Sequence, residues 1–385
     1  MIEGAHLIME IGDLSLDLAP RCVVESLVEL QVNESSGTQR SGFQFKLQYE
    51  PDSEIGRDLL PDGFFDAPRR VKFVLLMNGN MHVLIDGIIT RQDITQSSTL
   101  GQSSLTITGM DLTQVMDQID LTGVPMPAMP TFTQVDFMLV PYMAYGIIPM
   151  VIPTVQLANF NPVKSVPARQ GTDYAHITRL ASEAGYVFYI YYNSLGQNIA
   201  YWGPEVQLGE IQRPLSVNMG TDSNVDSINF GYDGISKPLY VLWHKDDLLT
   251  GMTIPIPMPD TNPLSPSLGH ESIAPRKFVQ LNHRSTKTED NDAMAKKSVP
   301  EVLMSGLGKA ARDANVVSAS GSLDVLRYGD LLRARHLVSV RGAGDRYNGL
   351  YYVEKTTTTL KPGDIQQSFS LKRNAHGVFP DSVAA

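Results

Sequence analysis

The sequence predicts a mainly β protein in which two similar antiparallel β-barrel domains flank an α+β section. Alternating and β-branched runs fill the first hundred residues and return near the end of the chain. A capped helix and an aromatic hairpin lie between them, and the two strand-rich regions share one outline. With 385 residues, 42% of them hydrophobic, the chain can bury a sizeable core and is long enough for roughly two or three domains.

Charge and cysteine content narrow the possible functions. The chain has 31 Lys and Arg against 41 Asp and Glu, and this net charge of −10 argues against a nucleic-acid-binding surface as its main function. Cys22 is the only cysteine, so the fold has no internal disulfide and is compatible with a reducing compartment. The N-terminus lacks a basic segment followed by an apolar stretch, so we expect no secretory signal.

The first predicted domain, residues 1–118, is a barrel or sandwich of antiparallel strands. Turn residues separate the strand-like runs "HLIMEI", "LVELQV", "FQFKLQY", "RVKFVLLMN", "MHVLIDGIITRQDIT" and "SSLTIT". A short helical piece starts near Asp111. The sequence after it becomes rich in Pro and Met, which places a boundary near residue 118.

An uncharged segment over 137–163 is long enough to raise the question of a membrane span. Pro141, Gly146, Pro149 and Pro153 would remove or strain hydrogen bonds of a spanning helix, and no Lys/Arg cluster flanks the run. We therefore predict a short buried helix followed by an apolar loop, and no integral membrane segment. The alternative is a surface that a partner subunit covers.

The predicted α+β domain spans 119–212, and its central helix is well marked. Thr172 is a good N-cap residue, Tyr174 and Ile177 begin an apolar stripe at helical spacing, and Gly185 suits the position just past the end. The strand "YVFYIYY", the turn "NSLG" and the strand "QNIAYWG" then predict a hairpin.

The second barrel domain is predicted over 213–375, with a proline-rich arm and a helical insert at about 245–315. Six prolines between residues 255 and 275 rule out a regular helix or a central strand, so we expect an extended, exposed arm. A helical stretch broken at Pro300 follows, and then the strands "DLLRARHLVSV", "GLYYVEKTTTTL" and "IQQSFSLKR". Residues 376–385 are expected to form a loosely held tail.

The two barrel regions contain a weak internal repeat. In each, a strand is followed by a long Thr-rich strand that a glycine opens, then by a glycine turn and an alternating strand. Gly87 and Gly101 are fourteen residues apart, as are Gly349 and Gly363. The matched strand order around these glycines predicts a duplicated barrel unit.

Motifs that would indicate catalysis or metal binding are weak. "SGLGKAA" places Gly306, Gly308 and Ala311 in a G-x-G-x-x-A arrangement, but a helix rather than a strand precedes it, which favours a flexible helix end. One cysteine and eight scattered histidines show no zinc-ligand spacing, and "GQSSL" and "SASGSL" are ordinary turn sequences. We predict no cofactor, no metal and no catalytic residue.

His176 raises the question of an active site because it lies between Asp173 and Glu183. It is off the apolar stripe of the predicted helix, and nothing nearby in the sequence supplies a nucleophile. A solvated or hydrogen-bonded helix histidine is therefore the favoured interpretation.

Two stretches resemble the baseplate-hub family of contractile phage tails and injection systems, which includes phage late control protein D and the N-terminal half of VgrG spike proteins. The first is "RQGTDYAHITRLASEAGYVFYI"; the second is "LDVLRYGDLL" followed by "GAGDRYNGLYYVEKTTTTLKPGDIQQSFSLKRN". Many relatives have a His where this chain has the Thr run 356–359, so no role of that His is transferred. The residues that carry the resemblance, with expected structural roles, are Arg169, Thr172, Asp173, Gly185, Tyr186, Gly329, Asp330, Tyr347, Gly349 and Tyr351.

The resemblance implies an assembly. A trimer of chains that each hold two similar barrels would place six barrels in a ring with pseudo-sixfold symmetry on one side and threefold symmetry on the other. Such a hub would join a sixfold tail tube to a threefold spike and line a central channel. The excess of acids would let polyanionic cargo pass by like-charge repulsion. The chain resembles a stand-alone hub without the further domains of some relatives.

The leading hypothesis is therefore a non-enzymatic structural hub. Expected partners are two further copies of the chain, the spike protein, the tail tube protein and baseplate wedge proteins, with DNA or effector cargo only passing through. The expected location is the baseplate centre of a virion or injection-system particle assembled in the bacterial cytoplasm. The alternative is a tail-associated cell-wall hydrolase or carbohydrate-binding component, although the sequence singles out no pair of carboxylates.

Overall fold

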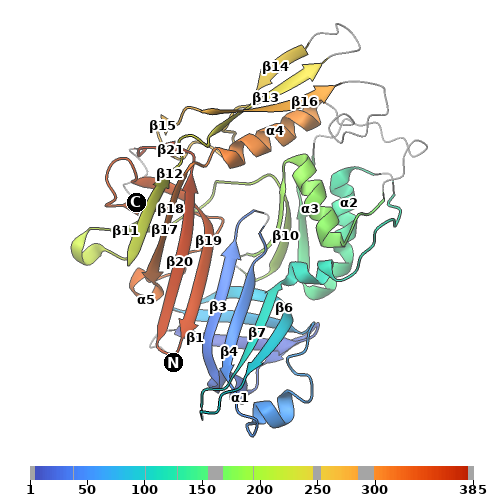
Figure 1. Ribbon diagram of the computed structural model, residues 1–385, viewed down its shortest axis with the longest axis vertical. Helices are drawn as coiled ribbons and strands as arrows, with labels where there is room; N and C mark the ends of the chain where they lie inside the picture. Colours follow the sequence, from blue (N-terminus) through green and yellow to red (C-terminus); the bar gives the residue numbers. More distant parts are fainter. Residues whose placement is uncertain are drawn as a thin grey trace.

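Strands are the commonest element of the described chain, and many of them belong to one large, mainly antiparallel sheet (Figure 1). The predicted mainly β fold class is confirmed. The computed structural model describes residues 5–37, 39–99, 101–127, 129–154, 168–193, 195–245, 253–284 and 299–379.

Seven antiparallel strands form what we call the N-terminal strand unit. They are β1 (Ala5–Gly12), β2 (Leu16–Leu18), β3 (Leu27–Ser35), β4 (Gly42–Gln48), β5 (Arg70–Met77), β6 (Asn80–Thr95) and β7 (Ser104–Asp111). Their order in the sheet is β3-β4-β7-β6-β5-β1-β2. The side chains of β4 alternate between buried Phe43 and Phe45 and exposed Gln44 and Lys46, the period of two expected for a half-buried strand. Short helices α1 (Arg21–Glu25), η1 (Ile55–Leu59) and η2 (Leu112–Asp117) complete the unit.

The middle of the chain forms a small α+β layer. It contains α2 (Thr131–Leu139), η3 (Val140–Tyr145), β8 (Ile147–Val151), α3 (Asp173–Ala184), β9 (Val187–Tyr192) and β10 (Asn198–Gly203). The sheet order is β8-β10-β9, with β8 parallel and β9 antiparallel to β10. Fully buried Trp202 lies in its core, with its ring centroid 4.9 Å from that of Tyr186.

A second set of strands forms the C-terminal strand unit. It contains β11 (Ile211–Ser216), β12 (Ser227–Tyr232), β17 (Val317–Asp324), β18 (Leu337–Arg341), β19 (Gly349–Lys361) and β20 (Asp364–Arg373), with η4 (Gly220–Asp222) and α5 (Val325–Tyr328). Their order is β12-β17-β20-β19-β18-β11. Strand β19 also pairs with β3, so the two strand units share one continuous sheet.

The two strand units repeat one design. The sheet orders β3-β4-β7-β6-β5-β1 and β12-β17-β20-β19-β18-β11 place strands of matching chain order at matching positions. Both long strands have a bulge, at Thr90 of β6 and at Glu354 of β19. When the bulge of β6 is superposed on that of β19, Gly87 falls two positions away from Gly349. The two glycines match in the sequence repeat but do not occupy equivalent positions in the structure. One difference remains, because β1 is antiparallel to β5 whereas β11 is parallel to β18.

A third sheet carries part of the proline-rich arm. It consists of β14 (Thr253–Pro257), β13 (Pro238–Lys245) and β16 (Lys277–Arg284), in that order, and helix α4 (Val299–Asp313) packs against it. Edge strand β14 tolerates its two prolines because an outer edge needs no N–H donor. The arm is less exposed than predicted, because Met258 and Leu268 are buried. Pro300 lies in the first turn of α4 rather than breaking it, and residues 285–298 lie outside the described residues.

The segment "SASGSL", predicted as a turn, is instead part of the central strand β17. A Cβ atom on Gly321 would lie 2.1 Å from the carbonyl oxygen of Ser227 and 2.7 Å from the ring of Phe369. The small residues of β17 therefore reflect close packing between β12 and β20 rather than a chain reversal.

Other local predictions also need correction. The strand predicted at "DLLRARHLVSV" begins only at Leu337. The predicted apolar loop contains the edge strand β8, and 155–163 lie outside the described residues. No helix in the described ranges is long and apolar enough to cross a membrane. The start of the predicted tail is held in place, because β21 (Ala375–His376) pairs with β15 (Glu271–Ser272); residues 380–385 are not among those described.

Candidate functional site

The part of the chain that the structure describes contains no cluster of three or more His, Cys, Asp or Glu side chains that could hold a metal ion. His176 is only 2% exposed, so it is not solvated, and its Nδ1 accepts a hydrogen bond from the backbone N–H of Gln170 at 3.0 Å. Burial and the positive charges of Arg179 and Arg169 lower the pKa of His176. The hydrogen-bonded alternative of our interpretation is thus the one observed.

Three residues that carry the resemblance meet at the start of α3. Thr172 caps the helix, and its hydroxyl also donates to a carboxylate oxygen of Asp117 in η2. Asp173 accepts from the guanidinium of Arg169 at 2.6 Å and from the hydroxyl of Tyr142 at 2.8 Å. These bonds fix α3 against η2 and η3, which gives the three residues a role in orienting the helix.

The other end of α3 meets α4 through two glycines. Gly185 ends α3 with φ of 75°, and a Cβ atom there would lie 2.8 Å from the Cα of Ser305. A Cβ atom on Gly308 would lie 2.3 Å from the carbonyl oxygen of Gly185. Arg312 donates to the carbonyl oxygens of Gly185 and Tyr186 at 3.2 and 3.3 Å. "SGLGKAA" was predicted to be a flexible helix end, but it lies inside α4, where Gly308 permits close packing against the end of α3.

The C-terminal residues of the resemblance form a buried cluster at the start of β19. The hydroxyl of Tyr351 donates to the carbonyl oxygen of Tyr347 at 2.8 Å, and the guanidinium of Arg373 lies over the Tyr351 ring at 4.8 Å. Tyr347 stacks on Phe230 of β12, with 4.9 Å between ring centroids. Gly349 has φ of 118°, and a Cβ atom there would approach Arg373 to 3.2 Å.

Gly329 and Asp330 lie apart from these three groups. Gly329 ends α5 with φ of 80°, and its carbonyl oxygen accepts a hydrogen bond from the side chain of Asn78 at 3.2 Å. Asp330 is exposed. The ten residues singled out in the sequence therefore lie in four places and do not form one site.

The joint between the two strand units is the strongest candidate for a functional site. Strand β19 pairs with β18 through Gly349–Tyr352, and beyond its bulge with β3 through Lys355–Leu360. Thr358 lies opposite Val32 and is buried. In Figure 1 the red strands β20 and β19 accordingly lie beside the blue strands β3 and β4 in the same sheet.

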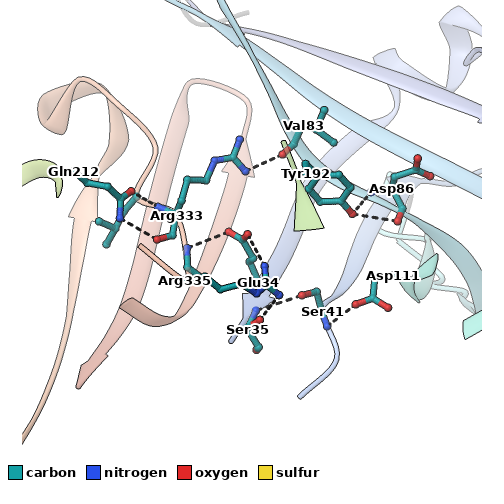
Figure 2. A network of polar contacts seen from close by, with 12 residues as sticks. Glu34, Ser35, Ser41, Val83, Asp86, Asp111, Tyr192, Gln212, Arg333 and Arg335 are labelled. Carbon is teal, nitrogen blue, oxygen red and sulfur yellow. Dashed lines mark hydrogen bonds and ion pairs between the residues drawn. The ribbon is translucent and has the colours of Figure 1, made fainter. Parts of the chain in front are cut away.

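A buried ion pair lies at this joint (Figure 2). Glu34 of β3 accepts from the Arg335 guanidinium at 3.1 Å and from the backbone N–H of Ala334 at 3.2 Å. The Arg335 side chain, 9% exposed, also donates to the carbonyl oxygen of Ser35 and lies over the ring of Tyr189 at 4.3 Å. One arginine thus links β3, the segment before β18 and the α+β layer.

Arg333 makes a second link (Figure 2). Its backbone N–H donates to Gln212 at 2.7 Å, and its carbonyl oxygen accepts from the same side chain at 3.0 Å. Its guanidinium donates to the carbonyl oxygen of Val83 in β6 at 2.8 Å. The segment before β18 therefore connects β11 to the N-terminal strand unit.

Asp86 attaches the α+β layer to β6. Its carboxylate accepts two bonds from Arg70, at 2.6 and 2.7 Å, and one from Asn198 at 2.9 Å. Its backbone N–H donates to the hydroxyl of Tyr192 at 2.8 Å (Figure 2). Burial raises the pKa of Tyr192 well above its ordinary value, which keeps this hydroxyl protonated. All these contacts hold segments together, and none assembles a nucleophile with a base.

Sequence comparisons find no match, whereas structural comparison finds proteins of similar fold. Neither the scan against protein-family models nor the search of curated proteins found a match. A tail protein from Neisseria meningitidis matches with a TM-score of 0.58 and 13% identity, over 96% of this chain and 97% of that one. A 43 kDa tail protein from prophage MuSo2 of Shewanella oneidensis gives 0.57 and 11%, over 96% and 98%. The chain has the fold of these tail proteins.

A similar fold occurs in a PdpA-VgrG complex. The lidded PdpA-VgrG complex of Francisella matches with a TM-score of 0.55 and 9% identity, over 98% of this chain and 54% of that one. At these identities the likeness concerns the fold. Because nearly the whole chain is covered, both strand units and the layer between them belong to it, and the fold expected from the resemblance is confirmed.

Sequence reasoning missed the residues that tie this tail-protein fold together, namely Glu34, Asp86, Arg333, Arg335 and Arg373. A signal existed for one of them, because Asp86 interrupts the apolar run "VLIDGII" and a carboxylate in a buried strand needs a partner. The arginines of "LLRARH" gave no comparable signal, because one face of an antiparallel sheet can be exposed to solvent, and alternate residues of a strand on that face can then be charged.

Proposed function

We propose that this chain is a non-enzymatic structural hub of a phage tail or injection system and forms a homotrimeric ring. The carrying observation is that one chain holds two copies of a strand unit, joined side by side through β19 and β3. Three chains would supply six units, so one face of the ring could match a sixfold tail tube and the other a threefold spike.

The surface of the C-terminal strand unit is consistent with a channel wall. A shallow hollow over its strands is lined mostly by small hydroxyl side chains, with Lys355 as the one charged residue that lines it. Short uncharged side chains offer passing cargo few strong contacts. The lining is therefore proposed to be polar and weakly charged in this region, in place of the acidic lining that the net charge suggested.

The matched structures support the proposed location and partners. Two are tail proteins and one is a complex of VgrG with PdpA, which supports a place at the tail baseplate next to a spike-type protein. Tube and wedge proteins, and passage of DNA or effectors, belong to the same proposal. So does the division into a first barrel (1–118), an α+β domain (119–212), a second barrel (213–375) and a tail.

Mass and shape in solution test this function. Light scattering should give three times the chain mass of 42.3 kDa, and negative-stain images should show rings with a central opening. A stable monomer at micromolar concentration would contradict the hub. We expect no turnover of purified peptidoglycan, and activity in that assay would favour the cell-wall hydrolase instead.

A further inference from the structure

Among the strand edges that lack a strand partner within the described ranges, two belong to matching parts of the large sheet. Strand β12 is the last strand of the large sheet and pairs only with β17. Strand β6 pairs with β5 as far as Ile88, so Arg91–Thr95 pairs with β7 on one side only. Such edges readily pair with another chain, and proteins usually cover or interrupt them.

The internal repeat shows what would fit these edges. With the bulges superposed, Arg91–Thr95 of β6 corresponds to Lys355–Thr359 of β19, and β12 holds the position of β3. Inside the chain, those two counterparts pair with each other. The molecule thus already contains one example of the contact that its free edges could form.

Burial points in the same direction. Ile94 of β6 is 46% exposed, whereas its counterpart Thr358, which is covered by β3, is 5% exposed. Gln92 is exposed, and its counterpart Thr356 is buried. Covering the β6 edge as β3 covers the edge of β19 would therefore bury both side chains.

The β19–β3 register can be carried over through the paired strands β4 and β7, and β17 and β20. It places Ile94 opposite Phe230 and Arg91 opposite Asp233. Apolar-aromatic and opposite-charge neighbours are both favourable cross-strand pairs. A slip by one residue would turn Ile94 to the other face of the sheet.

We propose that β6 of one chain pairs antiparallel with β12 of a second copy of this chain, in the register that sets Ile94 opposite Phe230. The proposal rests on the proposed function, for which it names the contact between subunits. A second copy is the partner because one chain carries both complementary edges. The contact is head-to-tail. Such a contact closes into a ring when the rotation that relates neighbouring copies is a whole-number fraction of a full turn.

Engineered disulfides test the register. In a Cys22→Ser background, Thr95→Cys with Asn229→Cys should give covalent dimers and trimers on a non-reducing gel, because facing residues lie about 4.5–5.5 Å apart between Cα atoms. The matched pair Gln31→Cys with Thr359→Cys should close within one chain, because these residues face each other across β3 and β19. Asp93→Cys with Asn229→Cys, two positions out of register, should cross-link at least about tenfold less.

A charge placed at the edge tests the interface independently. Ile94→Lys should weaken association at least about tenfold, because a lysine cannot be buried beside Phe230 at low cost. The control Met81→Lys changes a 67% exposed residue of the same strand outside the contact and should assemble normally. Both variants should keep the circular dichroism spectrum of the parent chain, since both side chains are exposed within one chain.

The outcomes separate this proposal from the hub itself. Trimers that form without the Thr95/Asn229 disulfide would overturn the strand pairing and leave the hub standing. A monomer that forms no disulfide would contradict both. Cross-linked chains longer than three copies would support the pairing and contradict the trimer.

Discussion

At the scale of single residues, buried charges fix how distant segments fit together. Arg335 meets Glu34 across roughly three hundred positions of sequence, and both side chains are mostly buried. Removing one member of such a pair leaves the other without its partner, which costs more than the pair contributes. The ion pair at the joint therefore supports the fold and is not merely a surface contact.

We expect Arg335→Ala to lower the free energy of unfolding by about 3 kcal/mol. Arg335→Ala combined with Glu34→Gln should cost less than the sum of the two single changes, because neither variant side chain then carries an unpaired charge. Arg327→Ala, which removes an exposed pair with Asp226, should change stability by about 0–1 kcal/mol. Urea unfolding of the four variants measures all of these values, and additive losses would show that Arg335 and Glu34 do not act as a pair.

His176 predicts how stability changes with pH. Burial and the neighbouring Arg179 and Arg169 outweigh Asp173 and Glu183 and lower its pKa, so the unfolded chain binds a proton there more readily than the folded chain. The contribution of neutral His176 to stability is then fully present above its unfolded pKa of about 6.5. It is lost as the pH falls toward and through the lower pKa of His176 in the folded chain. The melting temperature should fall between pH 7.5 and pH 5.5, and less steeply in His176→Asn. Equal slopes would rule out a contribution from His176.

At the scale of elements, the contact between α3 and α4 depends on the absence of one side chain. A Cβ atom on Gly308 would collide with the backbone of Gly185, whereas one on Gly306 would meet only the side chains of Leu281 and Met258, at 3.3 Å. In a helix interior, alanine is more favourable than glycine by about 1 kcal/mol. Backbone cannot move aside as a flexible side chain can, so the two positions should respond differently.

Gly308→Ala should therefore destabilise the chain by about 1–3 kcal/mol, because the clash forces α4 away from α3. Gly306→Ala should be nearly neutral, since its helix propensity offsets a tight but yielding contact. The midpoint of urea unfolding compares them directly. A neutral Gly308→Ala would mean that α3 and α4 can separate without loss.

The strands of the N-terminal unit could be predicted because their sequences are β-branched or alternate locally, as β4 does, and the cap and end of α3 were equally local signals at Thr172 and Gly185. Strand β17 could not, because Gly321 is required there by the closeness of Ser227 and Phe369, which lie far away in sequence. The candidate site was missed for the same reason. Which strand lies beside β19 depends on chain segments that no local pattern relates, so neither the joint nor its ion pair was predictable.

At the scale of the molecule, the joint allows equivalent strands of the two strand units to be compared with and without a covering neighbour. Strand β19 has β20 on one side and β18 and then β3 on the other, whereas β6 beyond its bulge has β7 alone. The same strand design thus occurs once with its edge covered and once with its edge open. A difference in hydrogen-exchange rate between the two strands therefore measures the protection that the covering strand β3 contributes.

Hydrogen exchange should report this difference. In dilute solution, amides of 91–95 should exchange at least about a hundredfold faster than those of 355–360, because only the latter lie between two strands. When the chain is concentrated into its assembled form, 91–95 and 227–232 should become protected together. The short edge strand β2 should stay fast at both concentrations, since the proposed contact does not involve it. Equal protection of 91–95 and 355–360 in the monomer would mean that the chain covers its own β6 edge, and the free edge could not then bind a second copy.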